Sequence, residues 1–91
     1  MNSLYKTEEL VELEEKLVDI KELVLYNDDV NTFEHVIDSL IKICNHEPEQ
    51  AEQCAYIVHY KGKCTVKAGE FEKLRPMCEA LLDRGLSATI E

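Results

Sequence analysis

Four polar side chains in two short stretches have the chemistry to bind a cationic group. Asn27, Asp28 and Asp29 follow one another directly, and His59 lies near the end of a later apolar helix pattern. An ammonium group offers three donors and no acceptor, so it is bound by carboxylates, amide oxygens and neutral imidazole nitrogens. Asparagine and aspartate are also common turn formers, because their side chains bond the nearby backbone. A plain turn and a ligand site therefore both stay open at this point.

The same residues match neither a known metal-binding motif nor a known hydrolase motif. The stretch after Asp29 begins like a calcium loop, but Glu34 stands where that loop needs glycine. The chain has no nucleophile elbow and no Gly-rich phosphate cradle. The 4 cysteines form no Cys-x-x-Cys pair, so they lack zinc spacing and are interpreted as reduced apolar residues. The sequence predicts no enzyme, no metal and no cofactor.

Length and charge narrow the class of protein. The 91 residues suffice for one small domain. Lys and Arg number 10 against 19 Asp and Glu, and the net charge of -9 repels nucleic acids and anionic membrane surfaces but favours cationic ligands. No run approaches the roughly 20 apolar residues of a membrane span, and the N-terminus lacks a signal-peptide layout. We expect a cytoplasmic protein.

The elements that must position these residues follow from hydrophobic periodicity. The pattern predicts strands at 21–26, 63–68 and 86–90, with Cys64, Val66 and Ala68 facing inward in the second. It predicts helices at 33–44, capped by Thr32, at 48–62, and at about 70–84. Pro76 indicates either a kink in the last helix or its true start. The order β-α-α-β-α-β predicts an α+β fold, in which three helices cover one face of a small three-stranded antiparallel sheet.

Residues 1–20 differ from the rest of the chain. They carry six acidic side chains, with Leu10, Leu13, Leu17 and Ile20 at helical spacing between them. An isolated helix of about a dozen residues is marginal in water. We expect a flexible or conditionally helical tail over 1–20 and the folded domain over 21–91.

Two stretches of this domain resemble a known family. The sequences LVLYNDDVNTFEHVIDSLIKI and AEQCAYIVHYKGK are similar to those of ClpS proteins, and the resemblance extends over residues 21–91. It implies an adaptor without catalytic activity. Such an adaptor binds N-degron substrates by a hydrophobic first residue (Phe, Tyr, Trp or Leu) and docks, as a monomer, on the N-terminal domain of a Clp-type ATPase. Residues 1–20 would then be the delivery tail.

The resemblance also implies roles for individual residues. It places the substrate's α-amino group at Asn27, Asp28, Asp29 and His59. It places the first side chain in an apolar pocket of Leu25, Phe33, Val36, Ala55, Val58 and Leu86. Here Phe33 replaces the methionine that gates the pocket against β-branched residues, and Ala55 stands where a relative may have methionine. The shape of the pocket is therefore expected to differ.

Two other interpretations remain open from the sequence. The chain can be a plain interaction module whose turn binds no ligand, since its element order is also similar to the C-terminal domain of a ribosomal stalk protein. It can also be a hydrolase that uses the acidic turn. A peptide beginning with Phe and its N-acetylated twin separate the first alternative from N-terminal recognition, and peptide turnover after long incubation identifies the second.

Overall fold

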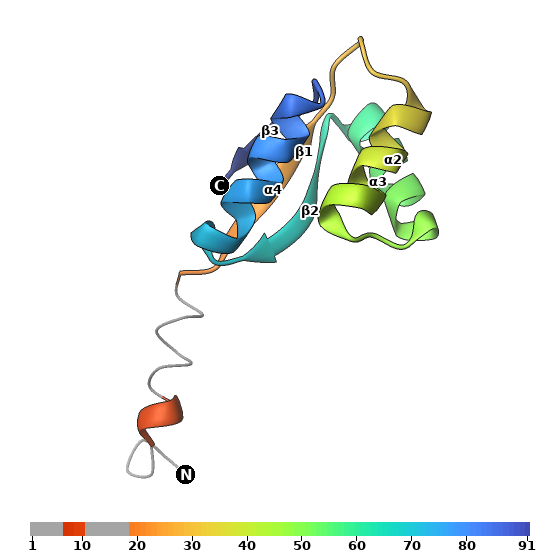
Figure 1. Ribbon diagram of the computed structural model, residues 1–91. Helices are drawn as coiled ribbons and strands as arrows, with labels where there is room; N and C mark the ends of the chain where they lie inside the picture. Colours follow the sequence, from red (N-terminus) through yellow and green to blue (C-terminus); the bar gives the residue numbers. More distant parts are fainter. Residues whose placement is uncertain (1–6, 11–18) are drawn as a thin grey trace.

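The predicted order of strands and helices is confirmed. The computed structural model describes residues 7–10 and 19–91, and its elements follow one another as β-α-α-β-α-β (Figure 1). They are β1 (Lys21–Tyr26), α2 (Phe33–Cys44), α3 (Pro48–Lys61), β2 (Lys63–Gly69), α4 (Phe71–Asp83) and β3 (Ser87–Ile90). Within the described residues, none of the helices is long and apolar enough to cross a membrane.

The sheet has its first strand in the middle. Its order is β2-β1-β3, and both pairings are antiparallel. Tyr26, at the end of β1, pairs with Lys63 on one side and Ser87 on the other. At the opposite end, the backbones of Glu22 and Glu91 exchange two hydrogen bonds of 2.8 Å. The polar run after Tyr26 is therefore held at one end of the sheet.

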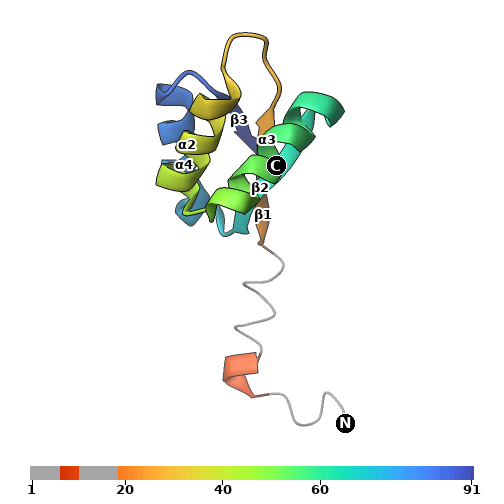
Figure 2. The ribbon, with the colours of Figure 1, turned by 90° about the vertical axis from the view of Figure 1, so that its right-hand side faces the viewer.

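All three helices cover the same face of the sheet, as predicted. Leu23 and Leu25 alternate along β1 and are fully buried against the helices, with Val66 and Ala88 beside them from the outer strands. Helix α4 packs on β1 and β3, α3 packs on β2, and α2 contacts both other helices. Figure 2 shows α2 and α3 as neighbours that run in opposite directions. The uncovered face carries polar pairs such as Thr65 with Glu22.

The helix ends agree with their sequence signals. Thr32 Oγ1 accepts a hydrogen bond of 3.1 Å from the backbone N–H of His35 and caps α2. Gly62 ends α3 with a φ of 97°, a conformation that glycine adopts without a steric penalty. Helix α4 begins at Phe71 and continues through Pro76, so the alternative in which it starts at Pro76 is wrong.

One predicted inward position is wrong. Ala68 is exposed and Cys64 is partly buried, so only Val66 of the three predicted residues lies fully in the core. The cause is an irregularity opposite Leu23 and Val24, which places Ala68 against Glu22 on the polar face. The alternation of side chains along a strand, taken from the sequence alone, cannot reveal such a bulge.

Two further predictions concern the cysteines and the segment of residues 1–20. Cys44, Cys54, Cys64 and Cys78 are free thiols, and burial raises the pKa of Cys44 to about 11 and that of Cys54 to about 12. Residues 8–10 form a helical turn. The rest of the helix predicted within 1–20 lies largely outside the described residues.

Candidate functional site

A small cavity opens where β1 ends, α2 begins and α3 ends, at the upper end of the domain in Figure 1. Its volume is about 40 Å³, and roughly 10–15 Å³ suffices to hold one water molecule. Eleven residues line it: Leu25, Tyr26, Asn27, Asp28, Asn31, Phe33, Val36, Ala55, Val58, His59 and Leu86. Nine of the ten residues singled out in the sequence are among them.

The interior of the cavity is apolar. Leu25 from β1 is fully buried, and Ala55 and Val58 from α3 are 3% and 5% exposed. Leu86, which directly precedes β3, is 4% exposed. Because Ala55 and Val58 are three residues apart on α3, they lie on the same face of that helix. Strands and helices from distant parts of the chain therefore supply rigid walls for an apolar group.

The rim of the cavity is polar. Asn27, Asp28 and His59 line it, whereas Asp29 does not. The backbone N–H of Asn27 donates to the carbonyl of Gly62 at 2.9 Å, which ties the rim to the end of α3 just after His59. Within the described part of the chain, no hydrogen bond is made by the side chains of Asn27 and His59. Their acceptor atoms are available to a ligand.

Asp28 organises the turn that carries the rim. Its Oδ1 accepts 3.0 Å hydrogen bonds from the backbone N–H groups of Val30 and Asn31. The pKa of Asp28 is lowered: burial acts to raise it, but the hydrogen bonds from Asn31, Val30 and Ser87 outweigh that effect. Since Asp28 turns toward these donors, the next side chain, Asp29, is left exposed. Of the two carboxylates predicted to bind the α-amino group, Asp28 lines the cavity and Asp29 does not.

Sequence reasoning missed Asn31. Its side-chain nitrogen donates to Asp28 Oδ2 and to the carbonyl oxygen of Gly85, each at 2.9 Å. It thus connects the turn after β1 to the turn before Leu86, across one side of the cavity. The other missed residue is Tyr26, the last residue of β1. The position of Asn31 beside an acidic turn was a signal that it could belong to the site. Its partner Gly85, 54 residues away, could not be identified from the sequence.

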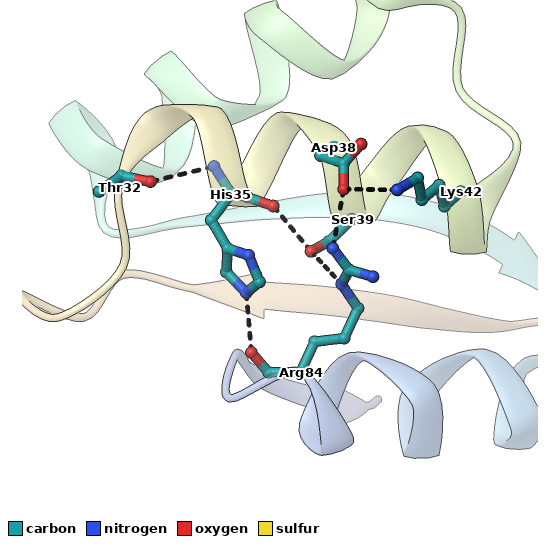
Figure 3. Close-up of polar contacts among 6 residues, drawn as sticks. All are labelled: Thr32, His35, Asp38, Ser39, Lys42 and Arg84. Atoms are coloured by element: carbon teal, nitrogen blue, oxygen red, sulfur yellow. Dashed lines mark hydrogen bonds and ion pairs between the residues drawn. The ribbon is translucent and has the colours of Figure 1, made fainter.

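A second set of polar contacts holds α2 against the end of α4 (Figure 3). His35 Nε2 lies 2.8 Å from the carbonyl oxygen of Arg84. The Arg84 side chain donates back to Ser39 Oγ and Asp38 Oδ2, each at 2.8 Å. The pKa of Asp38 is lowered, first by Lys42 and then by Arg84. These contacts fix the chain immediately before Leu86, and so they fix one wall of the cavity.

Aromatic rings extend outward from the rim. The Phe33 ring centroid is 5.1 Å from that of Tyr56 and 5.2 Å from that of His59. Tyr60 stacks at 6.2 Å on Tyr56 and meets the edge of His59 at 4.7 Å. Phe33 and His59 line the cavity, while Tyr56 and Tyr60 are 49% and 73% exposed. The wall of the cavity is therefore continuous with an exposed aromatic surface.

The arrangement suits a ligand with an apolar part and a cationic part. The apolar interior can enclose a side chain, while a carboxylate, an amide oxygen and an imidazole nitrogen at the rim can accept hydrogen bonds from an ammonium group. Among residues 7–10 and 19–91, no three His, Cys, Asp or Glu side chains lie together as metal ligands. The fold and the site define a small α+β domain with an apolar cavity that has a polar rim.

Comparison with known proteins identifies the family. The model of the family described as "ATP-dependent Clp protease adaptor protein ClpS" matches residues 19–89. The ATP-dependent Clp protease adapter protein ClpS of Thermosynechococcus vestitus is 38% identical over 66 residues, which are 71% of this chain and 70% of that protein. The chain belongs to the ClpS family, and its resemblance to ClpS adaptors of the Clp protease is confirmed.

Two further comparisons agree. The protein of the same name from Salmonella gallinarum is 44% identical over 41 residues, 45% of this chain and 39% of its own length. The solved structure of Agrobacterium tumefaciens ClpS2 bound to L-phenylalaninamide has a TM-score of 0.74 and 22% identity, and the match covers 80% of this chain and 95% of that one. The structural match shows that the fold is shared.

Proposed function

We propose that the cavity binds the first residue of a polypeptide, with the side chain inside and the free α-amino group at the rim. The observation that carries this proposal is the direct junction of an apolar interior with the three acceptor residues Asn27, Asp28 and His59. The Agrobacterium relative was solved with L-phenylalaninamide, which has a phenyl side chain and a free α-amino group. The two parts of that ligand correspond to the apolar interior and the polar rim of this cavity, which supports the proposal.

The chemistry of the rim supports an ammonium ligand. Asp28 is ionised at neutral pH, since hydrogen bonds hold its pKa below the ordinary range of aspartate, and its Oδ2 accepts a bond from Asn31. Asn27 Oδ1 and a ring nitrogen of His59 supply the other two acceptors. The enclosed side chain adds about 1.5–3 kcal/mol through burial of a phenyl or isobutyl group. Phe, Tyr, Trp and Leu are therefore the proposed first residues.

The bound polypeptide is the substrate, and the proposed partner is the N-terminal domain of a Clp-type ATPase. The domain of residues 21–91 captures the N-degron, and residues 1–20 serve as the delivery segment. The adaptor acts as a monomer and performs no chemistry on its substrate. This assignment rests on membership of the ClpS family.

The experiment compares a fluorescent peptide that begins with Phe with its N-acetylated twin. Binding of the first and loss of binding in the second are expected, because acetylation removes the cation and two of its donors. His59→Ala is expected to weaken binding by about 1.5–3 kcal/mol, since a hydrogen bond to a charged group is lost. His59→Gln retains an acceptor and should recover part of that loss. Glu79→Ala is the matched control, because this exposed carboxylate on α4 does not line the cavity.

The plain interaction module makes the opposite prediction. If the domain only docks a partner through its helices, the acetylated peptide binds as well as the free one, and His59→Ala changes neither. Equal affinity for both peptides would therefore rule out the proposed function.

A further inference from the structure

Three residues join α2 to the end of α4 in a closed cycle of hydrogen bonds (Figure 3). His35 Nε2 donates to the carbonyl of Arg84 at 2.8 Å, and the Arg84 side chain donates back to Ser39 Oγ at 2.8 Å. The hydroxyl of Ser39 in turn donates to the carbonyl of His35 at 2.7 Å. Ser39 is fully buried, so water has no access to replace the Arg84 bond. Because the cycle crosses between the two segments twice, it fixes the distance between them.

This cycle lies directly behind two walls of the cavity. Val36, the residue after His35 on α2, lines the cavity from one side. Leu86, two residues after Arg84, lines it from the entry to β3. The backbone N–H of Leu86 donates to the carbonyl of Leu81 at 3.0 Å, so the Leu86 wall stays with α4. The width of the cavity between these walls therefore depends on how closely the cycle holds α2 against the end of α4.

The cavity between these walls is small. Its volume is about 40 Å³, whereas an apolar cavity of roughly 150 Å³ binds benzene. An aromatic first residue therefore needs a wider cavity, and Leu86 can move away from α2 only against the bonds of the cycle. An oversized group forced into a packed apolar site weakens binding by about five- to 150-fold.

We propose that His35 and Arg84 are positioning residues that limit the size of the first residue, and that the cavity favours Leu over the larger Phe and Trp. This proposal rests on the proposed function, because the first side chain must enter the cavity for its walls to select it. Burial alone gives the opposite order, since a larger apolar side chain buries more surface. A preference for Leu therefore reports the size limit and not a general apolar attraction.

The test uses three peptides that differ only in their first residue, which is Leu, Phe or Trp. The unmodified protein should bind the Leu peptide at least about fivefold more tightly than the Trp peptide, with the Phe peptide between them. The double variant His35→Phe with Arg84→Met keeps large side chains at both positions but removes both bonds that cross between the segments. In this variant the ratio of Leu to Trp affinity should fall by about half or more.

Two control variants separate this effect from a general loss of structure. Lys42→Met removes the surface ion pair of 3.1 Å with Asp38, which belongs to the same group of contacts but lies within α2. His46→Phe removes a buried hydrogen bond elsewhere, at a residue that does not line the cavity. Both should keep the full ratio of Leu to Trp affinity. Arg84→Lys retains a donor and the charge, and it should keep part of that ratio.

Two outcomes overturn the inference. One is an unmodified protein that binds the Trp peptide as tightly as the Leu peptide. The other is a ratio that survives in the double variant, or in His35→Phe alone if the double variant does not fold, since apolar packing would then hold the wall by itself. The N-acetylated twin of the Leu peptide separates these failures from failure of the proposed function. If the twin does not bind, first-residue recognition stands without the size limit, and if it binds as well as the free peptide, both fail.

Discussion

The side-chain nitrogen of Asn31 lies 2.9 Å from the carbonyl oxygen of Gly85 and joins the two turns that border the cavity. The same amide bonds both oxygens of Asp28. Asn31→Ala removes all of these bonds and leaves a partly buried carboxylate short of donors. The free energy of unfolding should fall by about 1–3 kcal/mol, and the affinity for a Phe peptide should fall with it.

Urea unfolding and a fluorescence titration measure the two effects. Asn31→Asp serves for comparison, because it keeps the size of the side chain but places a second negative charge against Asp28 and the Gly85 carbonyl. It should be less stable than Asn31→Ala. An Asn31→Ala protein that unfolds at the wild-type urea concentration and binds normally would show that the link contributes to neither property.

The ionisation of Asp28 should couple stability to acid. Its pKa in the folded protein is lowered by hydrogen bonds from Asn31, Val30 and Ser87, which outweigh the opposing effect of burial. The resulting stabilisation is complete above about pH 4, the ordinary range of aspartate, and is lost as pH falls through the lower folded-state value. Urea unfolding between pH 6 and 3 should show this loss. Asp28→Asn should be less stable at pH 6 and show a shallower dependence. Identical slopes in both proteins would contradict the coupling.

The Phe33 ring should determine which first residues enter. It lines the cavity and is partly exposed, with Tyr56 and His59 against it. Branching at the β carbon widens a side chain where it passes this ring, so peptides that begin with Ile or Val should bind more weakly than those that begin with Leu. Phe33→Ala should admit them. The prediction is wrong if Ile and Leu peptides already bind the unmodified protein equally well in a fluorescence titration.

His46 should support the fold without taking part in binding. It is 4% exposed, and its Nε2 donates to the carbonyl of Val66 at 2.7 Å. Its Nδ1 has no partner among the described residues. His46→Phe fills the space but cannot donate, and should lower the free energy of unfolding by about 1–3 kcal/mol because the Val66 carbonyl is left unpaired. Peptide affinity of the folded protein should stay unchanged, since His46 does not line the cavity. A Phe variant as stable as the original would show that this bond contributes little.

Local signals in the sequence were sufficient for the order of the strands and helices. The apolar period of α2, the Thr32 cap and the proline and glycine at the two ends of α3 each act over a few residues, so the helix limits follow from them. The lining residues were inferred by resemblance to ClpS proteins, because the two stretches that are similar to ClpS sequences contain most of them.

The structural features that the sequence could not reveal depend on contacts between residues far apart in the chain. The register shift that exposes Ala68 arises from pairing with β1, more than 40 residues earlier in the chain. Asn31 contacts Gly85 and His35 contacts Arg84, across 54 and 49 residues. Asp28 and Asp29 have the same side chain and adjacent positions, and only the hydrogen bonds of the folded turn separate the carboxylate that lines the cavity from the one that does not.

The position of β1 in the middle of the sheet has a consequence for how the protein is made. This strand is synthesised first, but β2 begins at Lys63 and β3 at Ser87, so the nascent chain leaves the ribosome with both edges of β1 unpaired. The neighbouring helices α2 and α3 need only local contacts and can form earlier. The residues that line the cavity extend from Leu25 to Leu86, and hence a growing chain completes this cavity only when the segment that leads into the last strand has emerged.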